Sequence, residues 1–332
     1  MGSTGRTYRS IARPARVVGR PEALARFPWL CDAAWRAADA LFPVRLPRSW
    51  ADALRGPEDP LALQALPAPE ELQSHPQDLQ DPVGEQAQQP LPWLVQKHPD
   101  RILLLLTQRC HLYCRYCFRR SHHRGAEDPT DEELDSAVQW IRESGARELI
   151  LSGGDPLAVR DAVIFDVIDR VRPLVPVIRI HTRAPITAPE RVTPALVEGL
   201  RARAPVWVLV HANHPRELTP PVRRALSLLV DGGLPVLNQA VLLAGVNDRV
   251  DVLEALSAAL LELRVFPYYL HHTDRAPGNA HLRVPADRGL DLHRRLAQRL
   301  SGVALPRYVI DLPDGSGKID VSTARARGIA ID

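Results

Sequence analysis

Residues 101–117 read RILLLLTQRCHLYCRYC, an apolar run followed after three polar residues by a group of cysteines. Cys110, Cys114 and Cys117 are three of only four cysteines in the 332-residue chain. Unpaired core cysteines behave as small apolar residues and are not expected to gather in one octet. We keep that core interpretation for Cys31. The octet predicts a metal centre directly after a strand.

The spacing of the three cysteines suits an iron–sulfur cluster. Three thiolates can bind three irons of a cubane, which leaves the fourth iron open to a substrate or cofactor. A zinc site is the main alternative, with His111, His122 or His123 as the fourth ligand, because three Cys plus one His is a common zinc set. Zinc sites usually pair two short knuckles, and no second knuckle follows in this sequence. The cluster is therefore the favoured interpretation.

From residue 101 onward, short apolar runs alternate with longer amphipathic segments. This alternation predicts six strand–helix units, a parallel sheet and right-handed crossovers. Six units are too few for a complete eight-stranded barrel, so we expect an α/β fold with a partial (β/α)6 barrel over residues 96–304. The expected strands are 102–107, 148–152, 177–182, 206–211, 236–242 and 265–270. The expected helices are 131–143, 161–171, 194–202, 220–231, 251–263 and 285–300.

The segments on either side of the barrel differ from it. Residues 1–95 are expected to form an N-terminal extension, with helical spacing over 21–41, a second helix capped by Ser49, and an extended wrapping segment over 60–92. Residues 305–332 form a short C-terminal segment. The first twenty residues contain five arginines and no acid, which we interpret as a basic tail in preference to a transit peptide.

Composition excludes several classes of function. Apolar content of 45% and charged content of 24% are those of an ordinary globular protein. A net charge of +3 is too small to predict nucleic-acid binding, and no apolar run is long enough to span a bilayer. Cysteines gathered in a cluster motif indicate a reducing compartment, so we expect a cytoplasmic protein.

Lysine is rare in this chain. Only Lys97 and Lys318 are lysines among 42 basic residues. An amine can form a Schiff base and a guanidinium cannot, so each retained lysine is a candidate for amine chemistry. The Gly-rich loop that ends at Lys318 does not fit the P-loop pattern.

Polar residues follow all six expected strands, where chemistry gathers in parallel α/β folds. Gly153 and Gly154 let backbone approach a ligand closely, although taken alone they fit a tight turn equally well. Asp274 and Asp311 lie near the ends of the last strands, and taken singly they fit caps or solvated loop acids better than a site.

The octet C-x3-C-x2-C, with an aromatic residue before its last cysteine, resembles the signature of the radical S-adenosylmethionine (SAM) superfamily. The resemblance implies that Cys110, Cys114 and Cys117 hold a [4Fe-4S] cluster whose open iron binds the methionyl part of SAM. It also implies that the segment Gly153, Gly154 and Asp155 contacts the methionyl amino group.

A wider set of motifs resembles one branch of this superfamily, the lysine 2,3-aminomutases and the similar enzyme that prepares β-lysine for elongation factor P. The match extends from about residue 41 to residue 318. Its strongest pieces are residues 99–107, 110–120, 151–157, 211–217, 238–243 and 267–270. The resemblance implies an enzyme that converts L-lysine to β-lysine with a [4Fe-4S] cluster, SAM and pyridoxal 5′-phosphate (PLP).

The same resemblance assigns the remaining site residues. Lys318 would bind PLP covalently and Arg101 would hold its phosphate. Further cofactor contacts are His211 and Gln239. For the substrate, Arg119 would pair with the carboxylate, where a guanidinium fork suits bidentate binding. The acids Asp274 and Asp311 would bind the ε-ammonium.

Several alternatives remain open. Two acids also suit a guanidinium, so an arginine 2,3-aminomutase is a second substrate interpretation, whereas a glutamate mutase would need a cation in their place. The elongation factor P-type enzyme is a third. From a different class, the chain could be a non-catalytic zinc or Fe–S protein. The expected partners are the amino acid substrate and an electron donor such as flavodoxin or ferredoxin, and a homo-oligomer is left open.

Overall fold

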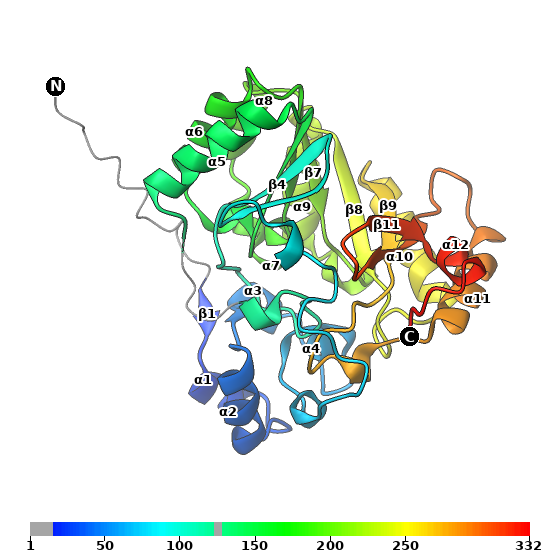
Figure 1. The fold of residues 1–332 in the computed structure, drawn as a ribbon. Coiled ribbons are helices and arrows are strands. Elements are labelled where there is room, and N and C mark those ends of the chain that lie inside the picture. The colour runs from blue at the N-terminus through cyan, green and yellow to red at the C-terminus, as the bar shows by residue number, and fades with distance from the viewer. Residues whose placement is uncertain (1–15, 123–127) are drawn as a thin grey trace.

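The computed structural model describes residues 16–122 and 128–332 (Figure 1). Its centre is a nine-stranded sheet in the order β11-β10-β9-β8-β7-β6-β5-β4-β3, curved into a nearly closed barrel. The six expected strands are confirmed and run parallel to one another. They are β4 (Arg101–Leu105), β5 (Glu148–Ser152), β6 (Val177–His181), β7 (Val206–Val210), β8 (Val236–Val241) and β9 (Phe266–His271).

Three further strands extend this sheet. β3 (Leu94–His98) pairs antiparallel with β4, β10 (Arg307–Leu312) runs parallel to β9, and β11 (Gly317–Asp320) returns antiparallel to β10. The two edges of the sheet approach each other, because a Cβ placed on Gly317 would lie 2.5 Å from Nε2 of His98. Residues 305–332 therefore add a parallel strand and an antiparallel edge to the barrel.

The expected helices are confirmed and cover the outside of the barrel (Figure 1). They are α5 (Asp131–Ser144), α6 (Asp161–Val171), α8 (Pro194–Arg201), α9 (Pro220–Asp231), α10 (Val250–Glu262) and α11 (Ala286–Ala297). The first of them, α5, begins with a capping box in which Thr130 and Glu133 each accept a backbone hydrogen bond from the other. Shorter helices are α7 (Ala184–Thr187), α12 (Val321–Ala326) and the 3-10 turns Pro69–Leu72, Gln86–Gln88, Arg120–His122, Pro156–Ala158, Pro189–Arg191, Pro215–Glu217 and Ala280–Leu282.

Alternation along the strands separates the core from the inside of the barrel. In β4, Ile102 and Leu104 are buried in the main hydrophobic cluster, which also contains apolar residues of the outer helices. Arg101 and Leu103 point the other way and line a cavity inside the barrel. Successive side chains of a strand point to opposite faces, so each strand supplies both core and cavity.

The N-terminal extension packs against the barrel. It contains β1 (Val17–Val18), α1 (Arg20–Arg26), α2 (Asp32–Leu41), β2 (Leu46–Pro47), α3 (Arg48–Ala51) and α4 (Pro60–Ala65). Several of its side chains, among them Leu46, Trp50 and Leu61, belong to the same hydrophobic cluster as the strands. The extension is therefore continuous with the barrel core.

Several details of the extension differ from expectation. The helical stretch expected over 21–41 is divided into α1 and α2, and the segment over 60–92, expected to be extended, begins with the helix α4. Pro47 is the cap residue of α3, and Ser49 lies inside that helix, where its hydroxyl donates to the Thr187 carbonyl at 3.0 Å instead of capping. Cys31 is exposed and is not a core residue. Residues 1–15 of the expected basic tail lie outside the described residues, as do residues 123–127.

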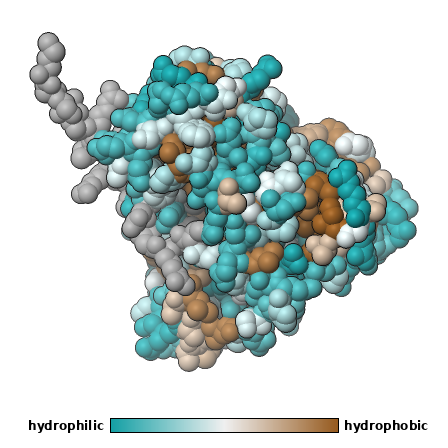
Figure 2. Space-filling model, viewed as in Figure 1, coloured by the Kyte–Doolittle hydropathy of each residue, from teal (hydrophilic) through white to brown (hydrophobic). Residues whose placement is uncertain are grey.

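The surface in the view of Figure 2 is largely hydrophilic, with smaller apolar areas, one of them in a hollow beside the C-terminal strand β11. In the two described stretches, no helix is both long enough and apolar enough to cross a membrane.

Candidate active site

The inside of the barrel holds a cavity of about 860 Å³. Every site residue expected from the sequence lines it, although these residues come from positions 101 to 318 of the chain. They are Arg101, Cys110, Cys114, Cys117, Arg119, Gly153, Gly154, Asp155, His211, Gln239, Asp274, Asp311 and Lys318. The fold therefore brings the whole expected set to one place.

The three cysteines lie on the loop that follows β4, and all three are free and partly buried. A turn holds the last two, because the Cys117 N–H donates to the Cys114 carbonyl at 3.0 Å. Burial raises the pKa of the Cys110 thiol well above its usual value. Burial, together with the neighbouring Cys114, raises the pKa of Cys117 to about 12. Thiols in such a place ionise readily only when a cation binds them.

The donor set of the cysteine loop is three free thiols, the number needed for three irons of a cubane. Across the described part of the chain, no three or more His, Cys, Asp or Glu side chains converge closely enough for one metal ion. A zinc ion needs its ligands at about 2.0–2.3 Å from one point, whereas the thiolates of a cubane bind different irons. His111 is buried, with Nε2 3.3 Å from the Leu157 carbonyl. His123 and the side chain of His122 lie outside the described residues.

Three arginines of the cysteine loop form ion pairs with the N-terminal extension. Fully buried Arg115 pairs with Glu71 through two N–H groups, Nη2–Oε2 being 2.5 Å. Arg120 pairs with the same carboxylate at 2.9 Å. Arg119 pairs with Glu85 through Nε–Oε2 at 2.8 Å and Nη2–Oε1 at 2.6 Å. The wrapping segment expected over 60–92 thus supplies the counter-charges of this loop.

The Gly-Gly segment after β5 packs directly against the start of the cysteine loop. Gly153 has φ +130°, and a Cβ there would collide with the Thr107 carbonyl. A Cβ on Gly154 would collide with the Arg109 carbonyl, and the Gly154 N–H donates to the Thr107 carbonyl at 2.6 Å. Only glycine adopts that φ without strain and fits this close approach.

Asp155 makes its contacts within the protein. One carboxylate oxygen accepts from the Leu157 N–H at 2.9 Å and the Thr182 hydroxyl at 2.6 Å, and the other accepts from the Arg183 N–H at 2.8 Å. Its side chain therefore joins the loop after β5 to the loop after β6.

His211, the residue after β7, and Gln239, within the neighbouring strand β8, also line the cavity. His211 Nε2 lies 3.1 Å from the Tyr116 hydroxyl and 3.2 Å from Asn213 Oδ1. Burial, reinforced by the charge of Arg183, lowers the pKa of His211 well below its usual value. The ring is therefore neutral at physiological pH.

Lys318 and the two acids lie together at the closing edge of the barrel. Lys318 Nζ lies 2.5 Å from Asp311 Oδ2, and Lys318 opposes Asp311 in the register of β10 and β11. Burial opposes ionisation of Asp311, but the charges of Lys318 and His271 outweigh it and hold the pKa of Asp311 below its usual value. Burial, with the charge of Asp311, raises the pKa of Asp274 to about 8.

Comparison with known proteins identifies the family. Residues 104–256 match the radical SAM superfamily. The L-lysine 2,3-aminomutase of Clostridium subterminale is 41% identical over 269 residues, which cover 80% of this chain and 65% of that protein. The L-lysine 2,3-aminomutase of Buchnera aphidicola is 34% identical over 288 residues, which cover 85% of each chain. This chain belongs to the lysine 2,3-aminomutase family.

Members of the lysine 2,3-aminomutase family differ in length. This chain spans 65% of the Clostridium relative and 57% of the L-lysine 2,3-aminomutase of Bacillus subtilis, to which it is 41% identical. Among solved structures, a radical SAM methyltransferase from Sphaerobacter thermophilus is similar, with a TM-score of 0.44 and 19% identity over 65% of this chain and 68% of that one.

The cavity also contains charged and titratable residues to which the sequence analysis assigned no role. Glu85 and Arg183 line the cavity and carry charge. His181 also lines it, with a buried Nε2 that has no hydrogen-bond partner among the described residues, and burial lowers its pKa well below the usual value. His181 is the last residue of β6 and Arg183 lies two residues after it, so their position at a strand end was a usable signal. Glu85 lies in an irregular segment whose pattern predicts no contact.

Proposed function

We propose that this protein is an L-lysine 2,3-aminomutase that converts L-lysine to β-lysine. The observation that carries the proposal is that one cavity joins three cysteines, Lys318 and a pair of acids. These are the groups needed for an iron–sulfur cluster, a covalent PLP site and an ammonium site. The names of the relatives support the same reaction.

The cavity residues divide between the cofactors. Cys110, Cys114 and Cys117 would bind three irons of a [4Fe-4S] cluster, and the backbone at Gly153 and Gly154 would face SAM, with His211 and Gln239 nearby. Lys318 would attach PLP and Arg101 would hold its phosphate. When bound, these groups supply a carbon radical that removes hydrogen from the β-carbon and a site that carries the migrating amino group.

Asp274 and Asp311 form the proposed side-chain pocket. Asp311 already binds an amine, that of Lys318. The ε-ammonium of the substrate would share Asp311 with Lys318. Asp274, held protonated by burial and by Asp311, would ionise when the second cation arrives. The two carboxylates would then balance two ammonium groups, that of Lys318 and that of the substrate, in a site where an unpaired charge is costly.

Arg119 is proposed to bind the substrate carboxylate. Its Nε and Nη2 are bonded to Glu85, and its Nη1 donates to the Gly153 carbonyl at 3.0 Å. These bonds use three of its five N–H groups, and a longer contact joins Nη1 to Ser152 Oγ at 3.4 Å, so a carboxylate would share the guanidinium with these acceptors or displace one of them. Glu85 would therefore weaken the binding of the substrate carboxylate to this guanidinium.

The proposal is tested by anaerobic reconstitution with iron and sulfide, followed by incubation with SAM, PLP and a reductant in the presence of lysine, arginine and glutamate together. We expect close to four irons and four sulfides per chain, a PLP absorbance that Lys318→Ala loses, and β-lysine as the main product by chiral analysis. β-Arginine as the main product would support the arginine alternative. Stoichiometric zinc without iron would contradict the radical reaction and support a non-catalytic metal protein.

The remaining expectations concern the setting of the reaction. A low-potential donor such as flavodoxin or ferredoxin would supply the electron. All four cysteines are free thiols, which agrees with a cytoplasmic location, since disulfides persist mainly outside reducing compartments. The product could serve elongation factor P or free β-lysine metabolism. Assays with and without elongation factor P, which measure whether β-lysine becomes attached to it, distinguish these two uses.

A further inference from the structure

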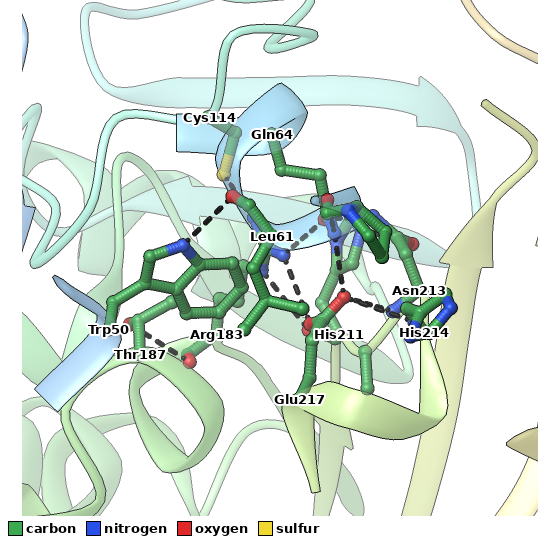
Figure 3. A network of polar contacts seen from close by, with 12 residues as sticks. Trp50, Leu61, Gln64, Cys114, Arg183, Thr187, His211, Asn213, His214 and Glu217 are labelled. Carbon is green, nitrogen blue, oxygen red and sulfur yellow. Dashed lines mark hydrogen bonds and ion pairs between the residues drawn. The ribbon is translucent and has the colours of Figure 1, made fainter. Parts of the chain in front are cut away.

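Arg183 reaches the cysteine loop from the turn after β6, two strands along the sheet from β4. It follows β6 and is 9% exposed. Its Nη1 donates a hydrogen bond to Cys114 Sγ at 2.8 Å. Figure 3 shows Cys114 at the edge of a polar network centred on this guanidinium. One of the three expected cluster ligands therefore has a buried cation beside its sulfur.

The other polar groups of Arg183 are all bonded, which fixes the direction of Nη1. Its Nη2 donates to Gln64 Oε1 at 2.7 Å and to Glu217 Oε2 at 3.1 Å, and its Nε donates to the His211 carbonyl at 3.2 Å. The guanidinium also lies over the rings of Trp50, at 5.0 Å, and Tyr116, at 5.5 Å. Such a side chain cannot turn away from Cys114 without breaking several contacts.

The backbone of Arg183 is held as well. Asp155 accepts from the Arg183 N–H at 2.8 Å and from the Thr182 hydroxyl at 2.6 Å. Asp155 thus places the turn from which Arg183 extends. Glu217, 1% exposed, also accepts from Gln64 Nε2 and from the Asn213 N–H, so the counter-ion of Arg183 is equally fixed.

We propose that Arg183 is a positioning residue that raises the reduction potential of the cluster through its charged hydrogen bond to Cys114. The inference rests on the proposed cluster. Reduction adds one electron from a low-potential donor and forms no bond at Arg183. The added negative charge is stabilised by a cation and a hydrogen bond at a ligating sulfur, which are among the factors that set cluster potentials.

The geometry also predicts the opposite effect for Glu217. Its carboxylate is a buried negative charge on the side of Arg183 away from Cys114. Removing the positive charge should make the cluster harder to reduce, and removing the negative charge should make it easier. A purely structural role of the network would not give shifts of opposite sign.

The test is an EPR-monitored redox titration of the reconstituted full-length protein without SAM, comparing wild type with Arg183→Gln, Arg183→Lys and Glu217→Gln. The matched control is Arg203→Gln, since Arg203 pairs with Asp169 and lies over Phe165 at the outer helices. Iron content and far-UV circular dichroism are measured on the same samples, so folding and cluster loading are known for each variant.

We expect Arg183→Gln to lower the reduction potential of the cluster by at least about 59 mV, which is a tenfold shift of a one-electron equilibrium towards the oxidised form. Arg183→Lys keeps the positive charge but loses the guanidinium geometry, so it should lower the potential less. Glu217→Gln should raise the potential, and Arg203→Gln should leave it unchanged. Equal potentials in wild type and Arg183→Gln, or shifts of the same sign in Arg183→Gln and Glu217→Gln, would overturn the proposal.

Two outcomes separate this inference from the proposed function. If wild type takes up no iron, the proposed function fails and the inference fails with it. If wild type holds a redox-active cluster but the reduction potentials of Arg183→Gln and Glu217→Gln do not shift in opposite directions, only the inference about Arg183 fails. Should Arg183→Gln retain no cluster, Arg183→Lys and Glu217→Gln decide the matter by the sign of their shifts.

Discussion

Arg119 and Glu85 form an ion pair with two hydrogen bonds inside the cavity, with Nε–Oε2 at 2.8 Å and Nη2–Oε1 at 2.6 Å. The pair joins the cysteine loop to a segment 34 residues earlier in the chain. Glu85 is 7% exposed, so its charge is largely withdrawn from solvent. The expected carboxylate-binding residue is therefore neutralised by the chain itself.

Breaking this pair should be costly in the protein without cofactors. Arg119→Gln leaves the Glu85 charge buried without its partner, and we expect it to lower the free energy of unfolding by about 3–5 kcal/mol. The double variant Glu85→Gln with Arg119→Gln should recover part of that loss. Urea unfolding of the four proteins in a double-mutant cycle measures the coupling. Strictly additive effects would show that the two charges do not stabilise each other.

Glu71 should be the main anchor of the cysteine loop. It pairs with Arg115 and Arg120, and Glu71→Ala would leave two buried guanidinium groups without their carboxylate. We expect a loss of at least about 3–5 kcal/mol of stability and weaker iron retention after desalting. Glu70→Ala is the matched control, because Glu70 is exposed next to it. Equal iron retention in both variants would argue against the anchor.

Gly153 should tolerate no side chain. Gly153→Ala places a Cβ against the Thr107 carbonyl at a φ of +130°, so the cysteine loop must shift. We expect a strong fall in melting temperature and in iron per chain. The control is Gly145→Ala at the end of α5, where φ is +65° but no atom lies within 4 Å of the added Cβ. That change should cost about 1 kcal/mol with normal iron content.

Asp274 should make lysine binding depend on pH. With a pKa of about 8, its carboxyl group is mostly protonated at pH 7 and must release a proton to pair with an ammonium. The apparent affinity for lysine should therefore rise by up to about tenfold per pH unit up to about pH 8. Calorimetry in buffers of different ionisation enthalpy measures the released proton, and Asp274→Asn should abolish it. No proton release in wild type would remove Asp274 from the site.

The raised pKa of Asp274 also has a consequence for stability. The unfolded chain loses this proton near pH 4 and the folded chain near pH 8. Between these values the folded state binds more protons, so the stability of the protein without cofactors should fall as pH rises. Asp274→Asn should show a smaller fall over the same range, and this difference is measured by urea unfolding at several pH values.

The barrel could be predicted from the sequence because its signals are local. Strand β5 and helices α6 and α9 begin and end at the expected residues, since apolar spacing, capping residues and glycine act within a few positions. β3, β10 and β11 were not expected as parts of the sheet. They join it through partners in other segments, which the pattern of each strand alone does not specify.

By itself, the sequence determined the cysteine octet and the six parallel strands, whose carboxyl ends lie on the same side. The other residues of the cavity, among them Arg101 and Lys318, were expected from the family resemblance and not from the strand pattern. Only the tertiary structure decided the partners of the arginines. Arg119 is neutralised by Glu85, and Arg183 bonds both Cys114 and Gln64, the latter 119 residues away. A buried ion pair forms where folding brings two opposite charges together. The partners are far apart in the sequence, so no local run of residues predicts the pair.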